Sequence, residues 1–104
     1  MPIRRPISRE ERLVRREELA NEAAAGRLAL PGAIRRCREA LGLTQQEFAV
    51  RFGLTRIKVI QLETGRANPT QETLTKIAAP FGFTLGFVPR SRDAGTDKAI
   101  LEVG

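Results

Sequence analysis

The side chains that could catalyse a reaction are few and stand far apart in the sequence. Glu63, Glu72, Thr55 and Cys37 are the only conceivable catalytic groups, and none is paired with a base at a sensible spacing. The chain has no histidine, which removes the imidazole base, the Ser–His and Cys–His nucleophile pairs and the histidine metal ligand. A single cysteine rules out an intrachain disulfide and a cysteine zinc site. We therefore expect a protein that is not an enzyme and uses no metal or cofactor.

What the composition does offer is positive charge. The 104 residues include 18 Lys and Arg against 12 Asp and Glu, a net charge of +6. Residues 31–90 hold nine of the basic residues against four acidic ones, whereas residues 1–30 carry a net +2 and residues 91–104 a net −1. A strongly basic surface favours a polyanion as partner. The distribution indicates a folded basic core between an N-terminal extension and a polar tail.

The same composition indicates where the protein acts. No apolar run approaches the roughly 18 residues that a membrane span needs, and the N-terminus lacks a signal-peptide core. The lack of a disulfide framework fits a reducing compartment. We expect a cytoplasmic protein without a membrane partner.

The stretch from Thr44 to Arg66 predicts two helices joined by a glycine turn. Thr44 and Glu47 have the spacing of a capping box, Thr55 can cap the second helix, and Gly53 suits the left-handed turn between them. The apolar residues placed to form a shared core are Phe48, Phe52, Leu54, Val59 and Leu62. The residues left on or near the exposed side of the second helix are Arg56, Ile57, Lys58, Ile60 and Gln61.

Helices are also predicted on both sides of this pair. A helix can start at Pro31 and close at Gly42, and Thr70 can cap a further helix that ends before Pro80. Residues 31–80 are therefore predicted to form an all-α bundle.

The N-terminal extension, residues 1–30, carries one more predicted helix, over about 8–25. Ser8 and Glu11 have capping-box spacing there, and the strong helix formers Arg, Glu, Leu and Ala follow. Its apolar stripe is thin and consists of Leu13, Ala20 and Ala24, with Leu19 and Ala23 alongside. The helix is either a solvated one leaning on its neighbour or an arm that docks a partner.

After the bundle the period of the apolar residues changes from helical to alternating. Phe83, Leu85 and Phe87 alternate with small or polar residues, which is typical of a strand, and we place it over 81–89. A lone strand cannot satisfy its own backbone groups. Its simplest partner is the same strand of a second copy, across a two-fold axis; the alternative is an edge lying loosely on the helices. Residues 90–104 are predicted to be a mobile tail.

The Thr44–Arg66 stretch closely resembles the XRE/Cro repressor family. It reads TQQEFAVRFGLTRIKVIQLETGR. The positions that match the family signature are Thr44, Gln45, Glu47, Phe48, Ala49, Gly53, Leu54, Thr55, Leu62, Glu63 and Gly65. The resemblance covers residues 31–80 and implies a lambda-repressor-like helix-turn-helix bundle. The strand that follows looks like the HipB branch of toxin–antitoxin regulators, with HigA-type antitoxins as near neighbours.

The resemblance implies an antitoxin that binds an inverted-repeat operator on double-stranded DNA as a homodimer and represses its own operon. It also implies a toxin that the protein holds inactive, a HipA-like kinase in the HipB case or a RelE/HigB-like ribonuclease in the HigA case. A stand-alone Cro-like repressor without a toxin is the alternative, and a coactivator-like bridging protein belongs to a different class. The toxin rests on the likeness alone.

On the docking that the family implies, the helix opened by Thr55 enters the major groove. Arg56 would pair with guanine, Gln61 with adenine, and Lys58 with guanine or phosphate. Ile57 would either pack on a thymine methyl group or merely flank the core as an exposed residue. The residues implied to contact phosphates are Gln45, Thr55, Arg51 and Arg66. Further phosphate candidates are Arg35, Arg36 and Arg38 on the first helix of the bundle, which starts at Pro31, although an isolated surface arginine by default serves solubility.

Overall fold

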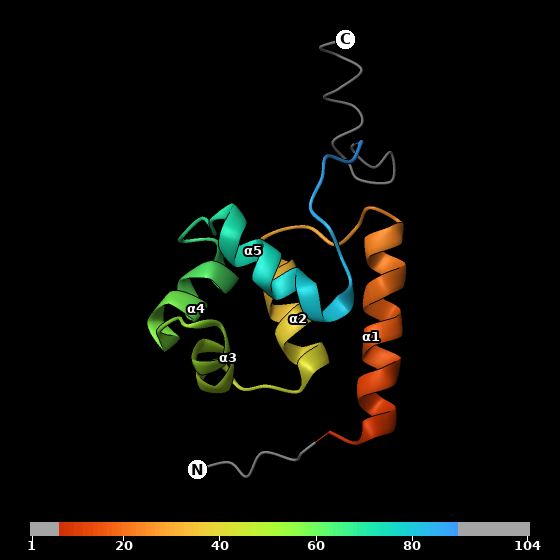
Figure 1. Cartoon of the computed structure of the whole chain (residues 1–104), viewed down its shortest axis with the longest axis horizontal. Helices are drawn as coiled ribbons and strands as arrows, with labels where there is room; N and C mark the ends of the chain where they lie inside the picture. The colour runs from red at the N-terminus through yellow and green to blue at the C-terminus, as the bar shows by residue number, and fades with distance from the viewer. Residues whose placement is uncertain (1–6, 90–104) are drawn as a thin grey trace.

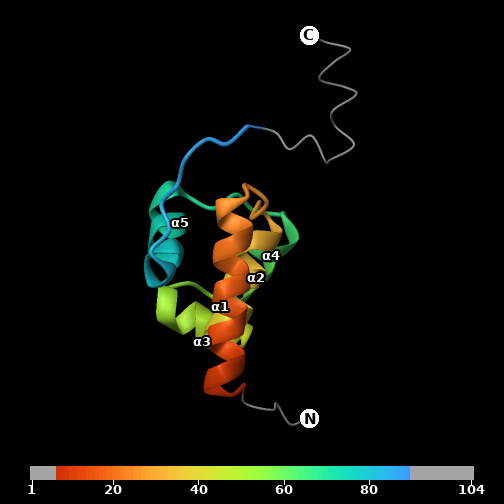
Figure 2. The ribbon, with the colours of Figure 1, turned by 90° about the vertical axis from the view of Figure 1, so that its right-hand side faces the viewer.

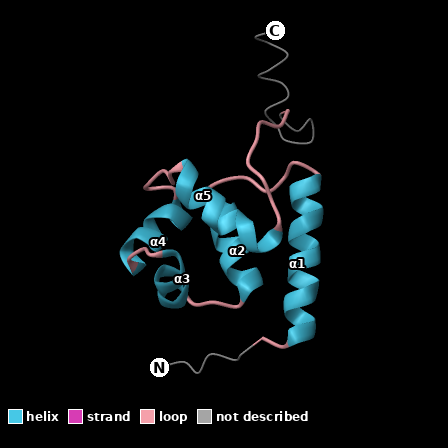
Figure 3. Cartoon of the chain, in the orientation of Figure 1, coloured by secondary structure: helices cyan, strands magenta, loops and turns pink. Residues whose placement is uncertain are grey.

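A computed structural model of the chain describes residues 7–89. Regular structure in that range is entirely helical (Figures 1 and 3). The elements are α1 (Arg9–Ala24), α2 (Gly32–Leu41), α3 (Gln45–Phe52), α4 (Arg56–Thr64), α5 (Gln71–Ala78) and the 3-10 turn η1 (Ala79–Phe81). Helices α2 to α5 form a bundle, and α1 stands along one side of it, against α2 (Figure 1).

Helices α1, α3, α4 and α5 begin where the sequence predicts them, because their caps are local. Ser8, Thr44, Thr55 and Thr70 each accept a hydrogen bond on the side-chain oxygen from the backbone N–H three residues on, at 3.0–3.1 Å. Such a bond satisfies one of the N–H groups that a helix start leaves without a partner. The end of α2 at Gly42 is also confirmed, but Pro31 precedes the helix as its N-cap and is not its first residue.

The core lies where α2, α3, α4 and α5 meet. Phe48 and Val59 have no exposed surface, and Ile34 and Leu62 are almost as deeply buried. Of the five predicted core residues, Phe52 and Leu54 are only partly buried and pack against this cluster from its edge. Burial of side chains of this size contributes roughly 1.5–3 kcal/mol each, so Val59 and Leu62 anchor one face of α4 in the core.

The inward face of α1 agrees with the predicted stripe only in part. Leu19 is 2% exposed and belongs to the core, whereas Leu13 is 58% exposed and Ala20 and Ala24 face solvent. The prediction is confirmed for Leu19 and wrong for Leu13, Ala20 and Ala24, because the face that meets α2 includes a charged residue. Arg15 lies on it, half-buried, and its Nη1 donates to the carbonyl oxygen of Glu39 at 3.1 Å.

A second arginine ties α1 to the end of the bundle. Arg16 Nη2 donates to the carbonyl oxygen of Pro80 at 2.5 Å, and its guanidinium lies 5.4 Å from the centre of the Phe81 ring. The view in Figure 2 shows α1 crossing in front of the bundle along most of its length. Helix α1 therefore leans on its neighbours and contacts both α2 and η1. This is one of the two arrangements that the sequence left open for it.

The predicted strand over 81–89 is not formed within the described chain. Phe81 closes the 3-10 turn, which corrects the predicted start, and residues 83–89 carry no regular element. A strand requires hydrogen bonds to a second extended segment, and residues 7–89 contain no other candidate. The pairing across a dimer stays a prediction, and the predicted tail over 90–104 lies outside the described residues.

The burial of Leu19 makes α1 an integral part of the fold. We expect Leu19→Ala to lower the free energy of unfolding by about 2–5 kcal/mol, because it removes buried methyl groups and leaves a cavity. Leu13→Ala on the exposed side of the same helix is the matched control, with an expected change below about 0.5 kcal/mol. Urea unfolding followed by circular dichroism measures both, and equal effects would mean that α1 does not share the core.

Candidate nucleic-acid interface

Helices α3 and α4 pack as one unit around a tight turn. The turn passes through Gly53 at φ 69°, a left-handed conformation that a side chain disfavours. The backbone N–H of Leu54 closes it by donating to the Ala49 carbonyl at 2.8 Å. Inside the unit, the rings of Phe48 and Phe52 lie with their centres 4.5 Å apart. The turn therefore fixes α4 against α3 at a set angle.

The N-terminus of α3 carries the predicted capping box in full. The N–H of Thr44 donates to Glu47 Oε1 at 2.8 Å, and the N–H of Glu47 donates to Thr44 Oγ1 at 3.1 Å. At the start of α4, Thr55 Oγ1 accepts from the N–H of Lys58. A hydroxyl that accepts one bond can still donate its own hydrogen. Thr55 is exposed, so that hydrogen is available to an anion beside the helix N-terminus.

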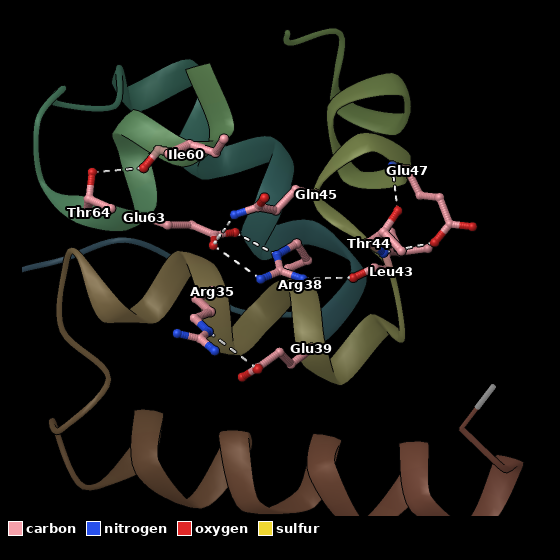
Figure 4. Close-up of polar contacts among 10 residues, drawn as sticks. All are labelled: Arg35, Arg38, Glu39, Leu43, Thr44, Gln45, Glu47, Ile60, Glu63 and Thr64. Carbon is pink, nitrogen blue, oxygen red and sulfur yellow. Dashed lines mark hydrogen bonds and ion pairs between the residues drawn. The ribbon is translucent and has the colours of Figure 1, made fainter. Parts of the chain in front are cut away.

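A buried ion pair connects three of the helices (Figure 4). Arg38 on α2 donates from Nε to Glu63 Oε2 at 2.6 Å and from Nη2 to Glu63 Oε1 at 3.1 Å. Its Nη1 donates to the Leu43 carbonyl at 3.1 Å, and Gln45 Nε2 on α3 donates to Glu63 Oε1 at 3.3 Å. The side chains of Arg38 and Glu63 are only 13% and 5% exposed. The last turn of α4 is thus held to α2, to the loop that precedes α3, and to α3 itself.

The residues predicted to contact bases gather on α4. Arg56, Ile57 and Lys58 form its exposed first turn, and Ile57 is 68% exposed. Gln61 lies one turn further on and is half-buried. The opposite side of α4 carries Val59, which is completely buried.

Two of the predicted site residues meet at one hollow in the surface. Gln45 and Arg56 both line a depression of about 430 Å³, together with Arg38, Leu43, Thr44 and Gln46. The structure thus places an amide from α3 and a guanidinium from α4 around the starts of both helices. Helix N-termini carry partial positive charge and free N–H groups.

The other predicted phosphate residues lie apart from this hollow. Arg51 is exposed on α3, with its guanidinium 5.6 Å from the centre of the Phe52 ring. Arg66 is exposed just after α4 ends at Gly65. No hydrogen bond in the described residues brings either of them to Gln45 or Arg56.

Of the three arginines of α2 that were considered as phosphate contacts, Arg38 has a structural role instead. The guanidinium of Arg38 is engaged by Glu63 and by the Leu43 carbonyl, so it serves as a brace and not as a surface cation. Arg35 and Arg36 are exposed, and Arg35 forms an i,i+4 pair with Glu39 at 3.4 Å. The sequence predicts all three on one helix. Only the position of Glu63 in the fold distinguishes the role of Arg38 from the roles of Arg35 and Arg36.

The one cysteine lies inside the fold. Cys37 is buried, and this burial raises the pKa of its thiol from the usual value near 9 to about 11, with the charge of Arg36 acting in the opposite direction. The thiol is therefore protonated at neutral pH, and a protonated thiol is a weak nucleophile. Across residues 7–89 no group of His, Cys, Asp and Glu side chains could hold a metal ion. No helix in that range has the length and apolarity to cross a membrane.

The arrangement defines a class of protein. A capped helix, a glycine turn and a second capped helix whose exposed first turn is basic, set on a small bundle, form a helix-turn-helix domain.

Comparison with known proteins agrees with this class. Residues 34–88, more than half of the chain, match the helix-turn-helix family, and the chain belongs to that family in its XRE type. An uncharacterized HTH-type transcriptional regulator of Haemophilus influenzae is 32% identical over 80 residues, 77% of this chain and 80% of that protein. Another, from Methanothermobacter thermautotrophicus, is 47% identical over 49 residues, 47% of this chain and 71% of that protein. No solved structure matches significantly.

The buried ion pair of Arg38 and Glu63 should respond differently to the loss of one partner and to the replacement of both. We expect Glu63→Ala to lower the free energy of unfolding by about 3–5 kcal/mol, because it leaves the Arg38 guanidinium buried without its carboxylate. Replacing both partners by apolar residues, Arg38→Met with Glu63→Leu, should restore most of this loss.

The exposed pair of α2 supplies the control for this experiment. Glu39→Ala breaks the contact with Arg35, whose side chain is 64% exposed, and we expect a change below about 1 kcal/mol. Urea unfolding measures all the variants. An effect of Glu63→Ala no larger than that of Glu39→Ala would contradict the bracing role.

Proposed function

We propose that this chain is a sequence-specific DNA-binding transcriptional repressor that acts in the cytoplasm as a homodimer on an inverted-repeat operator. It would bind without catalysing a reaction and without a metal or cofactor. The observation that carries the proposal is the first turn of α4, which exposes Arg56, Ile57 and Lys58 while Val59 anchors the other side of the helix in the core. Both relatives described above are named HTH-type transcriptional regulators, which supports it.

Each exposed residue of α4 has a base that suits its chemistry. The planar fork of Arg56 fits the O6 and N7 acceptors of guanine, and the amide of Gln61 fits adenine. Lys58 would reach guanine or a phosphate. Ile57 makes no side-chain hydrogen bond, so a thymine methyl group is the feature that it would cover. A bidentate contact such as that of Arg56 gives about 1–3 kcal/mol of discrimination.

The remaining residues of the proposed interface would position the duplex without reading it. Gln45 uses one amide hydrogen on Glu63, and its second hydrogen can reach a phosphate oxygen. Thr55 can donate its hydroxyl hydrogen to a phosphate at the start of α4. Arg51 and Arg66 would add charge contacts on either side.

The dimer is proposed from the segment after the bundle. We assign residues 1–30 to an extension, 31–80 to DNA binding, 81–89 to dimerisation and 90–104 to a tail. Phe83, Leu85 and Phe87 would pair with the same residues of a second copy. A two-fold axis then places two α4 helices on inverted half-sites about one helical turn apart, or a small multiple of it.

Base-reading and phosphate-contacting residues can be distinguished by their effects on binding. We expect Arg56→Ala to cost about 1–3 kcal/mol on the operator and to relax base preference at one position of each half-site. Arg66→Ala should weaken binding to operator and random duplexes alike and reduce the salt slope by about one unit per lost phosphate contact. Fluorescence anisotropy across a salt series measures both. Equal losses from Arg56→Ala on operator and random DNA would refute its reading role.

A finer proposal follows from the resemblance to HipB and HigA: the repressor is an antitoxin that autoregulates its operon and neutralises a toxin. We expect the tagged full-length chain, purified from its native host after nuclease treatment, to retain a stoichiometric partner. A HipA-like kinase is expected first and a RelE/HigB-like ribonuclease second, identified by mass spectrometry. The nuclease step removes proteins bridged by DNA. Purification of the chain alone would contradict the antitoxin role and leave a stand-alone Cro-like repressor.

A further inference from the structure

An apolar groove of about 480 Å³ opens on the surface of the molecule. It is bounded by the end of α1, by α2 and α5, and by residues 83–88. Ile34, Cys37 and Ile77 are buried residues of its wall. All of the residues that line it are uncharged, and Thr84 is the only one with a polar side chain apart from the Cys37 thiol.

The segment beside the groove leaves apolar side chains uncovered. Phe83 packs against the core, but Leu85 is 44% exposed and Phe87 is fully exposed. Figures 1 and 2 show why: beyond η1 the chain runs along the bundle and then passes the C-terminal end of α1, away from the helices. The alternating apolar side chains therefore begin on the core and continue past its edge.

We infer that this groove is the seat for Leu85 and Phe87 of a second copy of the chain, each copy closing the groove of the other. The inference rests on the proposed homodimer and says where its apolar contacts are made. An antiparallel partner strand would lie next to residues 83–88, which are themselves one wall of the groove. Because the contact is two-fold, it forms twice in each dimer.

Charge excludes a polyanion as the occupant and agrees with a second copy of this chain. The chain as a whole is 29% charged, but residues 77–89 contain no charged residue and neither does the groove wall. DNA or a charged peptide would find no counter-charge there. The second copy brings an uncharged, alternating apolar segment to an uncharged groove.

The stability that a dimer needs points the same way. A two-stranded ribbon alone is at best marginally stable in water and requires an apolar surface behind it. Among the described residues, the groove is the apolar surface that adjoins the segment. A dimer held only by strand hydrogen bonds would leave Phe87 in solvent on both copies.

Photo-crosslinking locates the partner of Phe87 directly. The full-length chain carries photoreactive benzoylphenylalanine at the position of Phe87 and is mixed with an isotopically heavy copy before irradiation. We expect a covalent dimer whose light–heavy peptides join position 87 to α2 or α5. The same probe at Leu13, exposed on α1 outside the groove, should give no covalent dimer.

The other outcomes each overturn a defined part of the account. Crosslinks to other surfaces of the second copy, or to residues 90–104 of either copy, contradict the groove as the seat while leaving the dimer. Sedimentation of the wild-type chain as a monomer at all concentrations up to about 100 times that used for DNA binding contradicts the proposed dimer itself.

A truncation separates binding from folding. Phe87→Ala should raise the dimer dissociation constant at least about 30-fold in sedimentation equilibrium, as expected for a buried aromatic anchor, and Leu13→Ala should leave it unchanged. Because Phe87 is fully exposed within one chain, the unfolding of the dilute monomer should not change. An unchanged dissociation constant would contradict the inference.

Discussion

The ion pair between Arg38 and Glu63 is the contact on which the arrangement of the helix-turn-helix unit depends. It fixes the last turn of α4 to α2, and through Gln45 it also reaches the first turn of α3. Because both side chains are almost fully buried, neither can be lost without leaving an uncompensated charge inside the protein. Val59 sets the depth of α4 in the core, and the ion pair sets its direction. The first turn of α4 is exposed as a consequence of these two contacts together.

The features that sequence predicted well are those decided within a few residues. Thr44, Thr55 and Thr70 cap their helices through atoms only three residues away, so no knowledge of the fold is needed. The inward face of α1 could be predicted only in part from apolar spacing: Leu19 belongs to it, but so does Arg15, which is satisfied by a carbonyl of α2 that lies 24 positions away. Arg38 was indistinguishable from the other arginines of α2 for the same reason.

The alternating segment after α5 illustrates a different limit. The alternation of its apolar residues is local and can be recognised in the sequence. A strand, however, forms only with a partner strand, and residues 7–89 supply none. Phe81 instead turns inward under Arg16 at the end of the bundle. The groove beside this segment and the hollow at the starts of α3 and α4 have no lining residue in common. Dimerisation and DNA reading are thus proposed for separate surfaces of each chain.

Selection from a random pool of DNA duplexes tests the central claim, that α4 of a two-fold dimer reads DNA sequence. The full-length chain is bound to the pool, and the retained duplexes are amplified and sequenced over several rounds. The account predicts an inverted repeat whose half-site centres lie about one helical turn apart, or a small multiple of it. Retained duplexes with no common sequence would contradict it.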